Sequence, residues 1–394
     1  MHIAFRADSS DIIGHGHIMR CLTLAHALVA HAKREQRSPN TEIQISFLCK
    51  DHRNNINHLI EQTAFALLRI PRGKQAIVQQ DSQTWLSCTQ EQDAQQCIKA
   101  IQAKKTKIID ILVVDHYALD EQWHELVKPY CQQLMVIDDL ASRSLSCDLL
   151  LDQTLNRDPK QYKSLVPRHC QLLLGQNYML LRNEFSELKE QAKKQRQLRS
   201  KKLLEANFLI SMGGGDPDNL SQLALLAIAK LHSYHPNLSA TIIISSQSKH
   251  REALNQLSSR YTWCTLITDC SNMAEMMLNA DIAIGASGAT AWERCCLGLP
   301  TLTTVNAKNQ QLIAKNLTES GTSINLGWHQ ELNIEKITKE LKTLLSDPET
   351  YLAMVENSFK CCDGLGASRV AQAIIECINR QDTTLTTSKV KGVQ

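Results

Sequence analysis

The sequence lacks any apolar run approaching the roughly 18 residues that a membrane-spanning helix needs. One-sided charge is missing as well, because 43 Lys and Arg stand against 40 Asp and Glu, a net charge of +3. Such a balance does not by itself indicate nucleic acid or a membrane surface as a partner. Arg6, Asp8 and Asp11 interrupt the start, where a signal peptide would be apolar. We therefore expect a cytoplasmic protein without a membrane or nucleic-acid partner, and a monomer.

Metal, redox and dinucleotide spacings are absent too. The 14 cysteines include only two close pairs, Cys295–Cys296 and Cys361–Cys362, and adjacent pairs suit neither a C-x-x-C motif nor zinc. We interpret them as buried free thiols in a reducing compartment. Both glycine-rich loops fail the G-x-G-x-x-G fingerprint, because Met19 and Asp218 occupy its last position. The sequence thus indicates no cofactor and no metal, with NAD chemistry as an alternative that lacks its motif.

Short apolar runs alternate with amphipathic segments along the whole chain. Unbroken runs of Ile, Leu and Val are typical of strands whose sheet is covered on both faces, and 394 residues suggest two domains. We predict an α/β protein of two doubly wound domains with a cleft between them. The predicted strands are 2–8, 42–48, 107–115, 133–139, 148–153 and 171–175, then 207–215, 240–246, 265–268, 281–288, 300–305 and 323–327.

The domain boundaries follow from charge and composition. Residues 183–206 are highly charged and lack a strand, which favours a solvated helix plus linker over a phosphate-binding strip. The prediction is an N-terminal catalytic domain, a charged linker, a nucleotide-binding domain, a C-terminal helix that packs back on the first domain, and a flexible tail. Their ranges are 1–182, 183–206, 207–364, 365–380 and 381–394.

The stretch GASGATAWE, residues 285–293, indicates an anion site in the second half. A strand ends there, a turn of small residues follows, and backbone N–H groups join the hydroxyls of Ser287 and Thr290 around one point. Glu293 is placed to accept hydrogen bonds from a ribose. The alternative is a first-turn acid that is stabilised by the helix dipole.

Two further stretches follow predicted strands of the same half. The glycines of SMGGGD, Gly213 and Gly214 among them, allow a ligand or another chain segment to approach the backbone closely. Asn309 and Gln310 open a helix, and their amides offer donors and acceptors to phosphate or sugar oxygens. A hinge between domains and a polar helix start are the respective alternatives. Together these positions predict a half-site for a nucleotide sugar.

The first half offers one candidate base, in the stretch IIGHGHIMRC. Gly14 and Gly16 remove side-chain bulk, so a substrate can approach His17 closely. A helix start disfavours positive charge, so we expect a neutral imidazole, which a general base requires. A metal site lacks a third ligand near His15 and His17, and both histidines as plain surface residues are the alternative.

Other polar groups follow the strands of the first half. Asp115, His116 and Tyr117 come after one strand, and Asp138–Asp139 after the next. One of them is expected to orient the substrate or the base. Tyr178, Arg182 and Asn183 precede the charged segment, where sugar contact and interdomain packing are both open.

The opening RADSSDIIGHGHIMRCLTLA resembles the N-terminal signature of the pseudaminic-acid pathway hydrolase family. Its elements are R-x-D, a short polar loop, G-x-G-H and an Arg in the following helix. The resemblance continues in order through VVDHY, IDD, CDLLLDQTL, GQNYMLLRNEF, SMGGGD, GASGATAWE and KNQ.

This resemblance implies a GT-B fold of two Rossmann-like domains, with the nucleotide held mainly by the C-terminal one. It also implies hydrolysis of UDP-2,4-diacetamido-2,4,6-trideoxy-β-L-altropyranose with inversion and without a metal. His17 takes the position of the family's base. Asp8, Gly16 and Arg20 lie in the same signature and are expected to contact the substrate. The implied UDP contacts are Ser287, Gly288, Ala289, Glu293 and Gln310, and by position only, Asn156 and Tyr178 contact the sugar.

Two other functions are consistent with the same residues. One is a GT-B glycosyltransferase that uses a UDP-N-acetylated sugar, and the other is a UDP-sugar sensor without catalysis. The residues themselves do not distinguish an altro from a gluco sugar.

Overall fold

The computed structural model describes residues 1–34, 43–78, 81–104, 108–213 and 215–390, without the side chains of Asn309 and of residues 381–390. The chain forms two compact units. One contains Met1–Leu180 and Leu365–Gln394, and the other contains Leu181–Gly364.

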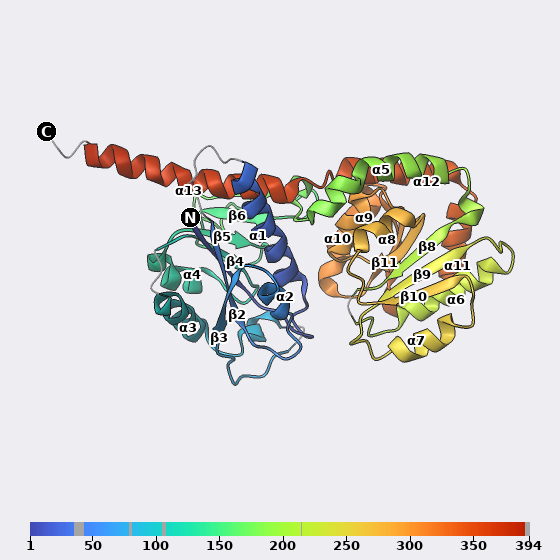
Figure 1. Ribbon diagram of the computed structural model, residues 1–394, viewed down its shortest axis with the longest axis horizontal. Helices are drawn as coiled ribbons and strands as arrows, with labels where there is room; N and C mark the ends of the chain where they lie inside the picture. Colours follow the sequence, from blue (N-terminus) through green and yellow to red (C-terminus); the bar gives the residue numbers. More distant parts are fainter. Residues whose placement is uncertain (35–42, 79–80, 105–107, 214, 391–394) are drawn as a thin grey trace. The chain divides into compact units, whose positions relative to one another are not determined.

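The first unit is built on a parallel sheet of seven strands in the order β3-β2-β1-β4-β5-β6-β7 (Figure 1). The six predicted strands are present with shifted ends. The prediction missed β3, which is short and is interrupted by the exposed Arg69. The bounds are β1 His2–Ala7, β2 Gln44–Lys50, β3 Ala66–Ile70, β4 Ile109–Asp115, β5 Cys131–Ile137, β6 Leu149–Asp152 and β7 Gln171–Leu174.

Helices cover both faces of this sheet. Alternate residues of β1 enter different apolar clusters, because side chains of a strand alternate between faces. Ile3 and Phe5 pack with α1 and α13, and Ala4 faces the side of α3 and α4. The helices are α1 Gly16–Arg34, α2 His58–Glu61, α3 Gln90–Ala103, α4 Glu121–Val127 and α13 Gly366–Val390, with short 3₁₀ turns at Ser82–Leu86, Lys128–Tyr130, Pro159–Tyr162 and Gln176–Tyr178.

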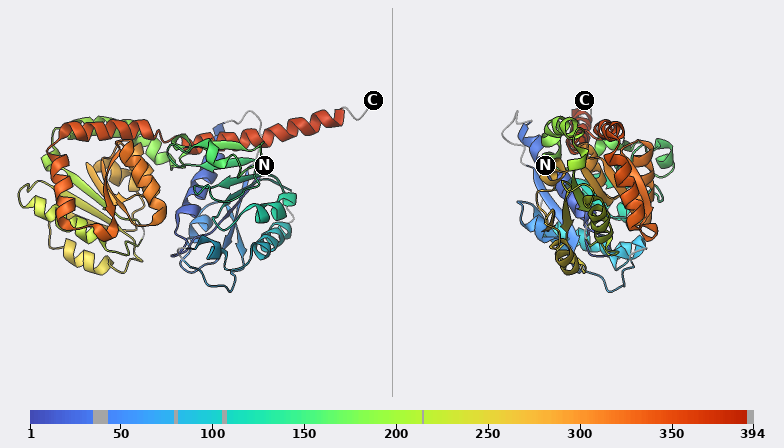
Figure 2. Two further views of the ribbon diagram at one scale, coloured as in Figure 1. Left: turned by 180° about the vertical axis from the view of Figure 1, so that it is seen from behind. Right: turned by 90° about the vertical axis from the view of Figure 1, so that its right-hand side faces the viewer.

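Helix α13 returns the end of the chain to the first unit, where it lies along α1 (Figure 2). Val370, Ala371 and Ile374 are completely buried in the core that β1 and α1 share. The helix continues to Val390, ten residues beyond the predicted end, and positions 391–394 of the predicted tail lie outside the described residues.

The second unit has a parallel six-stranded sheet in the order β10-β9-β8-β11-β12-β13. Each of its strands corresponds to a predicted one. They are β8 Asn207–Ser211, β9 Ser239–Ile244, β10 Cys264–Thr268, β11 Ile282–Ala286, β12 Thr301–Val305 and β13 Ser323–Trp328. The helices are α5 Asn183–Arg199, α6 Leu220–His232, α7 Arg251–Ser258, α8 Met273–Asn279, α9 Thr290–Cys296, α10 Gln311–Glu319, α11 Ile334–Leu345 and α12 Pro348–Cys361, with 3₁₀ turns at Leu203–Glu205, Lys308–Gln310 and His329–Glu331.

The charged segment 183–206 begins with a helix, as predicted, but this helix is not fully solvated. Its residues 183–199 form α5, which packs on α8, α9 and α12 of the second unit. Arg196 is completely buried, and its guanidinium donates hydrogen bonds to the backbone carbonyls of Met277 and Ala280 at the end of α8. The segment is therefore part of the second core and not a solvated connection.

Both sheets reverse their strand order at one point. In the first unit this point lies between β1 and β4, and in the second unit between β8 and β11. Ligands of open α/β sheets bind beyond the carboxyl ends of the strands at such a reversal. The fold thus indicates one candidate site in each unit. In the described part of the chain, every helix is too short or too polar to cross a membrane.

The buried face of α13 leads to a first prediction. Ile374→Ala removes apolar volume from the core of the first unit and should lower its free energy of unfolding by about 2–4 kcal/mol. Hydrogen–deuterium exchange should then become faster in β1 and α1 but not in β8 and α6. Gln372→Ala, at an exposed position of the same helix, should leave exchange unchanged. Equal loss of protection in both units would contradict the assignment of α13 to the first core.

Candidate active site

In the first unit, His17 lies at the strand reversal. It is the second residue of α1, directly after the loop that follows β1. Its Nδ1 lies 2.6 Å from Oδ1 of Asp115, the last residue of β4, and the Asp115 side chain is completely buried. Asp115 is therefore the partner that orients the predicted base.

The charge of Asp115 decides which nitrogen of His17 is free. Burial raises the pKa of Asp115, but Arg20 and the hydrogen bond from His17 outweigh burial and hold the pKa below its usual range. An ionised carboxylate only accepts, so Nδ1 of His17 carries the proton of this hydrogen bond. No described residue makes a hydrogen bond to Nε2, which is left to accept a proton from a ligand or water.

Arg20 contacts two carboxylates from one turn beyond His17. Its Nε lies 2.5 Å from Oδ2 of Asp115, and its Nη1 lies 3.3 Å from Oδ2 of Asp139. The guanidinium thus holds both carboxylates in place, which favours a positioning role. Substrate contact by Arg20 stays a prediction.

Two aromatic rings enclose the imidazole. The ring of Tyr117 stands edge-on to His17 with centroids 4.8 Å apart, and the ring of Trp85 lies at 6.2 Å. The hydroxyl of Tyr117 donates to Asp139 at 2.6 Å. Trp85 enters from the 3₁₀ turn Ser82–Leu86. This turn carries no recognisable motif, so Trp85 is not among the residues predicted from the sequence.

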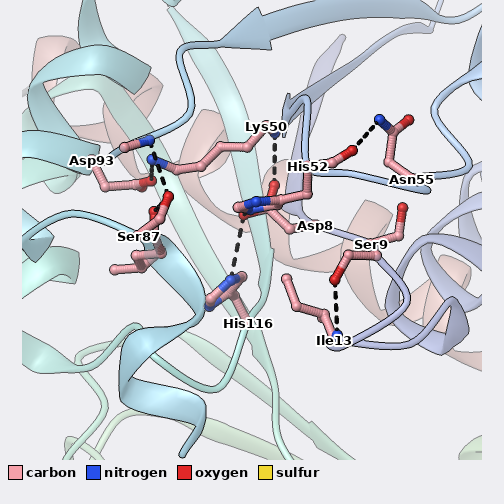
Figure 3. A network of polar contacts seen from close by, with 12 residues as sticks. Asp8, Ser9, Ile13, Lys50, His52, Asn55, Ser87, Asp93 and His116 are labelled. Carbon is pink, nitrogen blue, oxygen red and sulfur yellow. Dashed lines mark hydrogen bonds and ion pairs between the residues drawn. The ribbon is translucent and has the colours of Figure 1, made fainter. Parts of the chain in front are cut away.

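Asp8, predicted to contact substrate, lies inside a buried polar network instead (Figure 3). Its side chain is completely buried beside Arg6, accepts a hydrogen bond from the backbone of Lys50, and lies 3.4 Å from His116 and 3.6 Å from His52. Burial raises the pKa of Asp8, but Arg6 outweighs burial and lowers it well below the usual range. Asp8 thus supports the floor beneath the His17 loop, and its complete burial favours a structural role over the predicted substrate contact.

The second unit places its turn 286–290 at the end of β11, as the sequence predicts. Ser287 is completely buried, and its hydroxyl has no hydrogen-bond partner among the described residues. A side chain on Gly288 would approach Nε2 of Gln310 at 3.8 Å, so the two predicted residues face each other. Oε1 of Gln310 accepts from the backbone of Asn306 at 2.9 Å and is fixed by it. Ala289 caps the start of α9.

The environment of Glu293 disfavours the charged form of its side chain. Burial raises its pKa, and the attraction of Arg182, whose Nη2 lies 3.5 Å from Oε1, only partly opposes this. A protein gains no stability from a buried acid in this state, which is characteristic of functional positions.

Three glycines and Asn309 are further predicted contacts, and the structure describes only two of the glycines fully. Gly213 is exposed at the end of β8 with φ +87°, and a Cβ there would meet nothing within 4 Å. Gly16 is likewise open. Gly214 and the side chain of Asn309 lie outside the described residues.

The two predicted sugar contacts belong to the first unit. Tyr178 packs against its apolar core beside α13, which favours a packing role. Asn156 is exposed in the loop after β6 with φ +57°, and sugar contact by it stays a prediction.

The chain is similar to known proteins in sequence and in fold. Residues 183–374 match the model of the glycosyltransferase family 28 C-terminal domain. The chain is 25% identical over 325 residues to the UDP-2,4-diacetamido-2,4,6-trideoxy-beta-L-altropyranose hydrolase of Campylobacter jejuni, covering 82% of this chain and 98% of the relative. The resemblance to this hydrolase family is confirmed.

Two further similarities bear on length and fold. An uncharacterized protein of Methanocaldococcus jannaschii is 26% identical over 307 residues, 77% of this chain, but the alignment spans only 55% of that relative. The crystal structure of MurG from Acinetobacter baumannii matches with a TM-score of 0.65 and 14% identity, over 95% of this chain and 99% of MurG. The predicted GT-B fold is confirmed.

The buried state of Glu293 leads to a stability prediction. Because the folded pKa is raised, the charged form opposes folding as the pH rises above about 4.3, the unfolded value. Glu293→Gln should therefore raise Tm at pH 7.5 by about 2 °C or more. The difference should disappear near pH 4, where the wild-type residue is protonated. A variant that is less stable than wild type at pH 7.5 would show that the pair with Arg182 dominates.

The network around Asp8 leads to the opposite prediction. Asp8→Asn leaves Arg6 with less compensation in the interior and should lower the free energy of unfolding by about 3 kcal/mol at pH 7. Since the folded pKa is depressed, this loss should shrink as the pH falls below about 4. Urea denaturation at several pH values measures it, with the exposed Asp11→Asn as the control. A fully stable variant with weaker substrate binding would restore the ligand role of Asp8.

Proposed function

We propose that this protein hydrolyses UDP-2,4-diacetamido-2,4,6-trideoxy-β-L-altropyranose to UDP and 2,4-diacetamido-2,4,6-trideoxy-L-altrose with inversion. The observation that carries the proposal is His17, whose Nδ1 is bound to an ionised Asp115 while Nε2 is free. The identity of the substrate is taken from the name of the C. jejuni relative, which aligns over 82% of this chain.

In the proposed reaction, Nε2 of His17 removes a proton from a water molecule. The water oxygen forms a bond to the anomeric carbon from the face opposite the leaving group. The bond from that carbon to the β-phosphate oxygen breaks, and its electron pair leaves with UDP. Asp115 stabilises the imidazolium that forms, and Arg20 keeps Asp115 in place. The resemblance implies that no metal or cofactor takes part, so activity should persist in EDTA.

The second unit is the proposed nucleotide-binding part. The family 28 domain match and the turn 286–290 support this assignment. The backbone of the turn, with Ser287 and Gln310, is proposed to bind the phosphates. Glu293 is proposed to accept hydrogen bonds from the ribose, whose hydroxyls would add to the single contact that its partly buried carboxylate makes with Arg182.

A glycosyltransferase is the second candidate, because the family 28 domain and the likeness to MurG are consistent with it. The two functions differ in what accepts the sugar. UDP release by the purified protein in buffer alone supports hydrolysis, and release that requires an added acceptor supports transfer.

The hydrolase is tested by the fate of the isotope in ¹⁸O-water. Mass spectrometry should find the label in the sugar and none in UDP, because the bond to carbon breaks. Label in UDP would mean attack at phosphorus and would overturn the mechanism.

Substitution of the base should separate catalysis from binding. His17→Asn should lower kcat by about 10²-fold or more with little change in KM. His15→Ala is the matched control, since His15 is exposed in the same loop, and should retain nearly full activity. Equal activities of wild type and His17→Asn would show that His17 is not the general base.

Asp115→Asn should also lower kcat by about 10²-fold, because an amide does not fix the required tautomer of His17. The effect should not add to that of His17→Asn in the double variant, since both remove one unit. Additive losses would mean that Asp115 acts independently of His17.

A further inference from the structure

Arg294 lies buried behind the turn 286–290 of the second unit. Only 2% of the residue is exposed. Its Nη2 donates to the carbonyl oxygen of Ala286 at 2.7 Å, and its Nη1 lies 3.3 Å from the hydroxyl of Thr290. The guanidinium therefore joins the two ends of the turn from the inside.

This cation has no counter-ion of its own. In the described part of the chain, no carboxylate oxygen lies within 4.0 Å of its guanidinium, and Nε lacks a hydrogen-bond partner. The adjacent Glu293 attracts it only weakly, and burial lowers the pKa of Arg294 to about 10. An interior positive charge without compensation is costly, so its presence calls for a reason.

The residue next to the Arg294 guanidinium must be a glycine, because a side chain would collide with it. A Cβ at Gly285 would lie 2.8 Å from Nη1 of Arg294 and 2.6 Å from the carbonyl oxygen of Ser211. Glycine is therefore required beside the guanidinium. In the same turn, the completely buried hydroxyl of Ser287 also lacks a partner. Two buried polar atoms at this turn thus lack a hydrogen-bond partner, Oγ of Ser287 within it and Nε of Arg294 behind it.

We propose that Arg294 is a fixed counter-charge for the phosphate groups of the ligand, so that affinity at this turn rises with the negative charge of the ligand. The inference rests on the proposed nucleotide-binding role of the second unit. Because only 2% of Arg294 is exposed and both Nη atoms donate inward to the turn, Arg294 acts through its field and not by direct contact. The site is thereby selective for a nucleoside diphosphate over the monophosphate and the free nucleoside.

Arg196 of α5 offers a matched control. It is also completely buried, it also donates to backbone carbonyls, including that of Leu297 at 3.3 Å, and burial lowers its pKa as well. Its other partners are at the end of α8, so it serves the packing of α5 and not the turn.

The test compares UDP, UMP and uridine by competition binding to wild type, Arg294→Met, Arg294→Lys and Arg196→Met. Arg294→Met should weaken UDP binding about tenfold and UMP binding less, and it should leave uridine unchanged. Arg294→Lys should restore part of the preference for UDP. Arg196→Met should lower Tm but keep the wild-type ratio of UDP to uridine affinity.

The outcomes separate this inference from the proposed function. If Arg294→Met and Arg294→Lys lose stability like Arg196→Met and keep the wild-type ratio, Arg294 is only structural and the inference fails alone. If wild type binds neither UDP nor UMP, the proposed nucleotide site fails and the inference with it. Should Arg294→Met not fold, Arg294→Gln removes the charge but keeps a polar side chain, and a UDP-to-uridine ratio in Arg294→Gln equal to that of wild type would also overturn the inference.

Discussion

The first unit depends on one buried carboxylate, that of Asp115, shared between His17 and Arg20. The parallel register places Asp115 beside Ala7, at the end of β1 and immediately before the loop that carries His17. Because β1 and β4 are neighbours only at the reversal of strand order, the dyad exists through this topology. A carboxylate held in its charged form by Arg20 fixes the tautomer of His17 and leaves one nitrogen for chemistry.

The two units treat charge differently. Beneath the His17 loop, Arg6 and Lys50 are matched by Asp8 and Asp93, so the floor is neutral and rigid. In the second unit, Arg294 is a buried cation without a counter-ion. The first arrangement orients a base, and the second is suited to a ligand that brings its own negative charge. These differences are consistent with a division of labour in which one unit performs chemistry and the other binds the nucleotide.

Much of the fold was predictable because parallel strands appear as unbroken apolar runs. β3 is missed because it is short and carries Arg69. A helix is predicted for α5, but charge alone does not reveal that Arg196 is buried by the end of α8. Local glycines and helix position pointed to His17. The spacing did not reveal its partner, since 98 residues separate His17 from Asp115. The burial of Asp8 was hidden for the same reason, since it depends on contacts with distant residues.

The most direct test of the account is the tautomer of His17, observed by ¹⁵N NMR of selectively labelled protein at a pH where the ring is neutral. If Asp115 orients His17 as proposed, Nδ1 is protonated and hydrogen-bonded to Asp115, and Nε2 carries a lone pair. A ring that carries its proton on Nε2 would have no base directed at water, and would rule out the proposed role of His17.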